Sequence, residues 1–149
     1  KDIMHGVVSA IGDRLFWRVC MKPGGPAIAY TFGHTLGIAL SGNPFASYAT
    51  FELMARPVLA KLSDHAACEL VRAQAVLTDR FPKASHGRRF IRAYHENGKV
   101  RLPEQHASGS LASVVGCNAF IDIPAGTGPL EPGTEVDMYC YKGLRWFYD

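Results

Sequence analysis

Lys22 is the residue of this sequence whose neighbours best suit it to bind an anion. It ends a strand-like apolar run and is followed by a Pro-Gly-Gly-Pro turn at residues 23–26. A lysine held by such a turn is a fixed point charge for phosphate or another oxyanion. Arg18 lies four residues earlier, on the same side of the strand by alternation, and its guanidinium could bind an oxyanion bidentately. A solvated surface lysine and a half-exposed strand arginine are the alternatives.

A second candidate site lies where an apolar run, residues 36–40, breaks at Ser41-Gly42-Asn43-Pro44 and a helical pattern begins. Gly42 lets a ligand approach the backbone, Asn43 can cap the helix, and Pro44 suits the first helical position. The free N–H groups and the dipole of the helix would then attract an anion. The alternative is an ordinary strand-to-helix turn, because Gly, Asn and Pro punctuate most loops.

The order and spacing of these motifs resemble the molybdopterin molybdenumtransferase family, which includes the bacterial MoeA proteins and the matching domain of gephyrin. The resemblance rests on Lys-Pro-Gly-x-Pro at 22–26, x-Gly-Asn-Pro-x-x-Ser at 41–47 and the helical pattern that follows. Residues 106–136 are similar to the family's small C-terminal β domain. The resemblance therefore covers nearly the whole chain, but not the whole of a family protein.

The resemblance implies roles for individual residues. Lys22 matches a lysine of the family's active site, and Arg18 matches the position of a second basic group. Ser108 matches a serine that is presented to a neighbouring subunit's active site, although a polar turn residue is as good an interpretation. Gly25 stands where many relatives carry a second lysine, and Ser41 where they carry proline. Catalytic roles are thus expected for Lys22 and Arg18, and cofactor-binding roles for Gly24, Ser41, Gly42, Asn43, Pro44 and Ser108.

The family's activity gives the expected function of the full-length parent. By resemblance it is an enzyme of molybdenum cofactor biosynthesis, a transferase that inserts molybdate into adenylylated molybdopterin and releases AMP. Mg²⁺ is the family's metal, and its ligands are expected upstream of this chain, so no residue here is assigned to a metal. A homodimer with a small-molecule substrate is also implied. The alternative is a non-catalytic scaffold or dimerisation module of gephyrin type, which the absence of a lysine at Gly25 favours.

Hydrophobic spacing predicts the elements that position the first two motifs. Residues 2–12 form an amphipathic helix, residues 15–20 a strand, and residues 27–40 a hairpin whose strands are covered on both faces. A largely buried helix runs from residue 45 to about residue 62, and Pro57 should kink or split it. These elements predict an α/β layered unit, an incomplete domain of the molybdopterin-binding type, over residues 1–64.

Beyond residue 64 the pattern changes to short strands separated by Gly/Pro loops. Asn97-Gly98 favours a hairpin turn of the primed type. Regular short strands of this kind predict a small all-β barrel or sandwich over residues 65–149. The expected strands are residues 68–77, 89–94, 99–102, 119–123, 134–139 and 144–148.

Composition bounds the remaining possibilities. With 48% hydrophobic and 19% charged residues among 149, the chain is of the globular type. Its net charge of +3 is dispersed, which favours small anions over nucleic acid, and we interpret the densest basic group, residues 88–92, as a solvated strand face. No apolar run reaches the roughly 18 residues of a membrane helix, and no leader pattern is present.

The four cysteines are far apart in the sequence and have no close histidine partner. They predict neither a zinc site nor a disulfide framework, and they fit reduced thiols in the cytoplasm. The chain opens without Met inside a helical pattern, which suggests a fragment of a longer protein. We expect the isolated chain to be inactive, because none of its acidic residues forms a pair beside Lys22 or Gly42.

Overall fold

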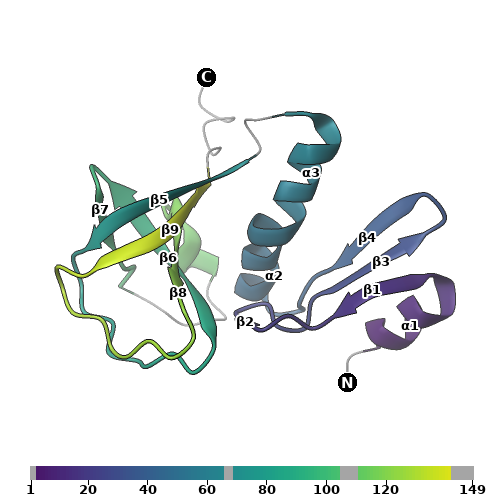
Figure 1. Ribbon diagram of the computed structural model, residues 1–149, viewed down its shortest axis with the longest axis horizontal. Coiled ribbons are helices and arrows are strands. Elements are labelled where there is room, and N and C mark those ends of the chain that lie inside the picture. The colour runs from purple at the N-terminus through teal and green to yellow at the C-terminus, as the bar shows by residue number, and fades with distance from the viewer. Residues whose placement is uncertain (1–2, 66–68, 105–110, 142–149) are drawn as a thin grey trace.

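A computed structural model describes residues 3–65, 69–104 and 111–141 of the chain. Figure 1 shows a column of helices standing between a small sheet on one side and a strand-rich unit on the other. Strands predominate, and the prediction of a chain that mixes helices with sheets is confirmed. The elements are α1 (Met4–Ile11), β1 (Asp13–Trp17), β2 (Met21–Lys22), β3 (Ile28–Phe32), β4 (Thr35–Ala39), α2 (Pro44–Thr50), a π-helical segment (Phe51–Ala55), α3 (Arg56–Ser63), β5 (Leu70–Leu77), β6 (Arg88–Glu96), β7 (Lys99–Arg101), a 3-10 turn (Leu111–Val114), β8 (Ala119–Ile123) and β9 (Glu135–Tyr141).

The small sheet is antiparallel and has the strand order β1-β3-β4. Phe32 pairs with Thr35 across the two-residue turn, so the predicted hairpin is confirmed. The prediction that both faces are covered is wrong for the described residues, because Phe32 is 60% and Leu36 is 41% exposed. Of the described helices, α1 makes the main contacts with this sheet, and it is too short to cover it.

The predicted long helix extends from Pro44 to Ser63 and is split as expected. Its π-helical segment leads into Pro57, whose ring cannot be accommodated by regular helical hydrogen bonding one turn earlier. Glu52, only 4% exposed, accepts a hydrogen bond of 2.9 Å from Arg56 across this segment. Most of the buried residues lie in the first half of the helix, because α3 buries only Ala60 and its Leu62 is 74% exposed. The prediction of a largely buried helix is therefore wrong for α3.

The strand-rich unit is held together by a closed circuit of pairings. β6 pairs with β7, β7 with β5, β5 with β9, β9 with β8, and β8 returns to β6. Asn97 and Gly98 both have positive φ, at 49° and 73°, as the predicted primed turn requires. The strand predicted at 144–148 lies outside the described residues. The apolar core inside the circuit includes Leu77, Ile91, Val100, Ile121 and Met138.

Two contacts join the N-terminal segment to the strand-rich unit. Phe45 and Ala49 of α2 pack with Phe90, Phe120 and Tyr141 in one buried cluster. The short strand β2 also pairs in parallel with the start of β6. The boundary predicted near residue 64 stays a prediction, and these contacts show that the two segments pack together across it. No helix within the described ranges is both long and apolar enough to cross a membrane.

Candidate functional site

A cavity of about 290 Å³, which we name the cationic cavity, lies at the junction of the two segments. Basic and apolar side chains line it, and no acidic residue is among them. A cavity of this composition can hold an anion whose charge the surrounding cations neutralise. Its lining residues are Lys22, Pro23, Phe45, Phe81, Lys83, Arg89, Phe90, Ile91 and Arg92.

The pairing of β6 explains why the cavity lies there. β8 pairs with residues 89–93 along one edge of β6. Along the other edge β2 pairs with residues 88–89 and β7 with residues 94–96. Between them, no described strand pairs with β6 along that second edge. The cavity is lined by the β6 residues of this gap, Phe90 to Arg92.

Lys22 and Arg89 are register partners in the β2–β6 ladder. Side chains of paired residues leave the same face of a sheet, so these two cations are direct neighbours. Like charges placed opposite each other are destabilising unless something of opposite charge lies between them. Neither has an ion-pair partner in the described part of the chain. The pair is therefore suited to bind an anion.

Arg92 borders the cavity from the opposite face of β6, since it lies three residues after Arg89 on the same strand. It is 2% exposed, and its Cζ lies 4.1 Å from the centroid of the Phe45 ring. Burial lowers the pKa of the guanidinium. A cation held over an aromatic face in this way has a fixed position.

The interpretation of residues 88–92 as a solvated strand face is wrong for Arg92. The sequence feature that points to these site residues is the basic cluster itself, Arg88-Arg89 followed by Arg92. The alternation of side chains along a strand does not predict which of the three is buried. The structure divides them: Arg88 forms two hydrogen bonds with Asp122, of 2.9 and 2.6 Å, whereas Arg89 and Arg92 face the cavity. Lys83 was also missed, because nothing in its sequence neighbourhood links it to Lys22.

Arg18 does not join Lys22 at the cavity. The predicted strand over residues 15–20 ends at Trp17, because Arg18 adopts a left-handed φ of 69° and its N–H bonds to Ala27. Arg18 and Lys22 therefore do not lie on one continuous strand, and the prediction that alternation places them on the same side is wrong. The Arg18 guanidinium lies over Trp17, with its Cζ 4.9 Å from the ring centroid. A catalytic role for Arg18 stays a prediction without support from its position.

The turn before α2 adjoins the cavity through Phe45, but Gly42, Asn43 and Pro44 do not line it. The Asn43 side chain accepts a 3.1 Å hydrogen bond from the Ala46 N–H, and Pro44 has no N–H to offer. Ser41 Oγ accepts a bond of 3.4 Å from the Asn43 N–H. The helix start thus satisfies much of its own hydrogen bonding, and cofactor binding by these four residues stays a prediction.

Gly24 is not among the residues that line the cavity, and cofactor binding by it stays a prediction. It has a φ of +95°, and a Cβ at this position would lie 2.3 Å from Thr50 Oγ1 and 2.7 Å from Met21 Cε. Only glycine fits both the backbone conformation and the close approach to α2. The turn after Lys22 is thereby packed against the helix. Ser108, the last predicted site residue, lies outside the described residues.

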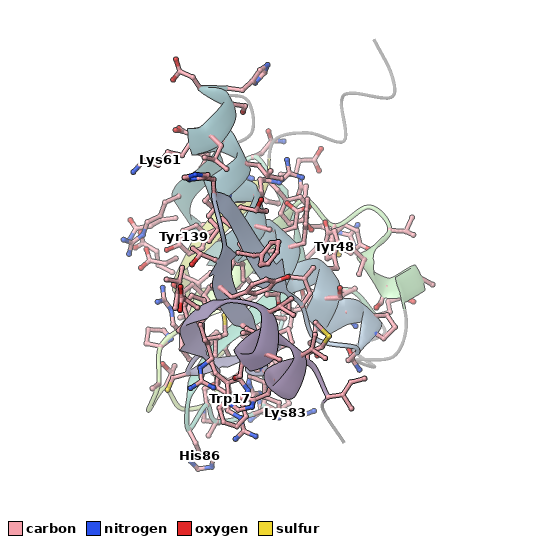
Figure 2. All side chains as sticks on the ribbon, turned by 90° about the vertical axis from the view of Figure 1, so that its right-hand side faces the viewer. Trp17, Tyr48, Lys61, Lys83, His86 and Tyr139 are labelled. Carbon is pink, nitrogen blue, oxygen red and sulfur yellow. The ribbon has the colours of Figure 1, made fainter. Side chains whose placement is uncertain are left out.

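A larger cavity of about 990 Å³ lies between the helices and the strand-rich unit. Its charged lining is mixed and includes Lys61, Asp64 and Glu69, so it lacks the single sign of the cationic cavity. Figure 2 shows Lys61 at the opposite end of the molecule from Lys83.

The described residues do not fit a magnesium site. None of them forms a group of three or more His, Cys, Asp or Glu side chains able to hold a metal ion. Hard cations such as Mg²⁺ require oxygen ligands, and the cationic cavity supplies none from carboxylates. We therefore assign no metal ligand among the described residues.

Comparisons with known proteins all point to one family. Residues 74–141 match the model of the MoeA C-terminal region, domain IV. The chain is 36% identical, over 97% of its length, to a molybdopterin molybdenumtransferase of Bacillus subtilis strain 168, of which it covers 36%. It thus spans about a third of the length of the curated relatives that it matches.

Solved structures agree with the sequence relatives. A molybdopterin biosynthesis MoeA protein from Pyrococcus horikoshii OT3 is similar with 30% sequence identity and a TM-score of 0.70, over 87% of this chain and 33% of that one. A second MoeA structure from the same species has 24% identity and a TM-score of 0.80, over 95% of this chain and 35% of the other, and shows the shared fold.

Proposed function

The chain belongs to the MoeA family of molybdopterin molybdenumtransferases, and from this premise we propose that it supplies the oxyanion-binding part of such an enzyme. The full-length protein would insert molybdate into adenylylated molybdopterin, with release of AMP. The observation that carries this proposal is the cationic cavity, where Lys22 lies beside Arg89, Arg92 is a further lining residue, and no acidic residue is among the lining.

The cavity residues would act by position and charge. Molybdate and the phosphates of the adenylylated substrate are both anions, so bringing them together requires cations that are already in place. Lys22 would hold an oxyanion at the mouth of the cavity, and Arg92, fixed over Phe45, would neutralise charge deeper inside. The packing of Gly24 against α2 would keep Lys22 at this mouth.

The rest of the site is proposed to come from outside this chain. The Mg²⁺ ligands would lie in the remainder of the full-length protein, a cytoplasmic homodimer acting on small molecules rather than nucleic acid. Ser108 would be presented to the active site of the neighbouring subunit. Residues 1–64 would complete a layered α/β domain together with that remainder, and residues 65–149 would be a separate barrel domain.

The test is molybdenum insertion by the full-length protein carrying Lys22→Ala. We expect the rate to fall at least tenfold, about 1.4 kcal/mol of transition-state stabilisation, because one fixed cation is lost. Lys99→Ala, at an exposed position in the β6–β7 hairpin, is the matched control and should retain activity. If a folded Lys22→Ala variant has unchanged turnover, Lys22 is a solvated surface residue and not part of the site.

The isolated 149-residue chain should show no turnover with adenylylated molybdopterin, molybdate and Mg²⁺. A non-catalytic scaffold is the competing proposal, and nothing in the cavity favours it. Titration calorimetry with adenylylated molybdopterin separates the two, because a pure scaffold predicts no heat of binding for the full-length protein.

A further inference from the structure

We propose that Lys83 and Arg89 are anion-binding residues of the cationic cavity and hold a tetrahedral dianion together with Lys22. This inference rests on the proposed function, because it assigns two more residues to the same oxyanion site. It identifies the ligand by its chemistry, a compact dianion such as molybdate or tungstate.

Lys83 is exposed, but the loop that carries it is fixed at both ends. Before it, Phe81 and Leu130 exchange two backbone hydrogen bonds of 2.9 Å. After it, the Ser85 N–H donates to Thr127 over 2.8 Å, and the Ser85 carbonyl accepts from Gly126 over 2.7 Å. Phe81 and Ser85 are buried, at 8% and 1% exposure. The backbone of a lysine between two such anchors is already ordered close to the cavity. Binding of an anion by this lysine therefore costs little further backbone entropy.

Arg89 differs from its neighbour Arg88 in how its hydrogen-bonding capacity is used. The carboxylate of Asp122 binds Arg88 through two hydrogen bonds. The Nε of Arg89, in contrast, is buried and has no hydrogen-bond partner in the described part of the chain. Buried polar atoms of native proteins are nearly always bonded, so such an N–H indicates a missing acceptor.

Two physical arguments make a dianion the matching ligand. The register places Arg89 beside Lys22, and Lys83 lines the same cavity, so three positive charges converge without a described ion-pair partner. Their mutual repulsion is relieved most by a ligand that carries more than one negative charge. A guanidinium can also bind two oxygens of one tetrahedral anion.

A structural role for Arg89 is the competing explanation, since its Cζ lies 5.6 Å from the Phe81 ring centroid. The two explanations predict opposite changes in stability. If Arg89 serves only to pack on Phe81, Arg89→Gln should lower the melting temperature of the ligand-free chain. If it is an anion-binding residue repelled by Lys22, the same change should leave that temperature equal or raise it.

The experiment titrates sodium molybdate into the full-length protein by calorimetry, with melting temperatures recorded with and without molybdate. We expect Lys83→Gln and Arg89→Gln each to raise the Kd at least fivefold and to shrink the molybdate-induced rise in melting temperature. Lys99→Gln, an exposed lysine outside the cavity, should leave both values unchanged.

The outcomes separate this inference from the proposed function. If Lys22→Gln weakens molybdate binding while Lys83→Gln and Arg89→Gln bind like the wild type, the inference is overturned and the oxyanion site stands. If the full-length wild type does not bind molybdate at millimolar concentration, both are overturned. If Arg89→Gln loses affinity only together with a large loss of melting temperature, the packing role replaces the proposed one.

Discussion

At Gly24 the structure shows a steric requirement for glycine, and cofactor binding by this residue stays a prediction. Its φ of +95° and the close approach of the Thr50 hydroxyl to the place a Cβ would occupy both exclude a side chain. We expect Gly24→Ala to lower the free energy of unfolding by about 2 kcal/mol or more, because strain and overpacking add. Chemical denaturation measures this difference.

Gly42→Ala is the matched control for Gly24→Ala. A Cβ at Gly42 would have no atom within 4 Å, and its φ is not in the left-handed region. The control should change the free energy of unfolding by less than about 0.5 kcal/mol. Equal destabilisation by both substitutions would contradict the steric account of Gly24.

The ionisation of Tyr48 is expected to lower the free energy of unfolding as the pH rises above about 10. Burial raises the pKa of Tyr48 to about 12. Between pH 10 and this value the unfolded chain loses the tyrosine proton while the folded chain keeps it, so stability must fall as the pH rises. Denaturation midpoints across this window should fall less steeply for Tyr48→Phe than for the wild type. Identical slopes would show that Tyr48 ionises as freely in the fold as in water.

Among the elements, the start of α2 allows a capping residue to be distinguished from a ligand-binding residue by substitution. Asn43 accepts a hydrogen bond from the Ala46 N–H, the geometry of an N-cap. We expect Asn43→Ala to cost about 1 kcal/mol of stability and to leave the Kd for molybdate unchanged. A loss of molybdate affinity without a loss of stability would instead support anion binding by this turn.

Elements with strong local signals could be predicted from the sequence. Asn97-Gly98 marks a primed hairpin turn, and Pro57 marks the interruption of the long helix; both are confirmed. The end of β1 could not be predicted, because an arginine in a left-handed conformation has no local signature there. The exposure of α3 was also missed, since its apolar stripe is the same whether or not another element covers it.

At the scale of the whole molecule, the cationic cavity is made by contacts that sequence reasoning cannot supply. Lys22 was identified from its turn, but its neighbours come from β6 and from the loop before it. Those residues meet only because β2 joins the end of β6 and α2 brings Phe45 under Arg92. The sequence could therefore name one cation of the site, while the fold was needed to find the others.

Binding of a tetrahedral oxyanion in the cationic cavity can be observed in a crystal of the protein soaked in sodium tungstate. Anomalous scattering locates tungsten without reference to any assumed site. We predict a peak inside the cavity, with tungstate oxygens about 2.7–3.2 Å from Lys22 Nζ and from a guanidinium of β6. A peak at the turn before α2, or no peak in the cavity at a concentration that saturates binding in solution, would contradict the account.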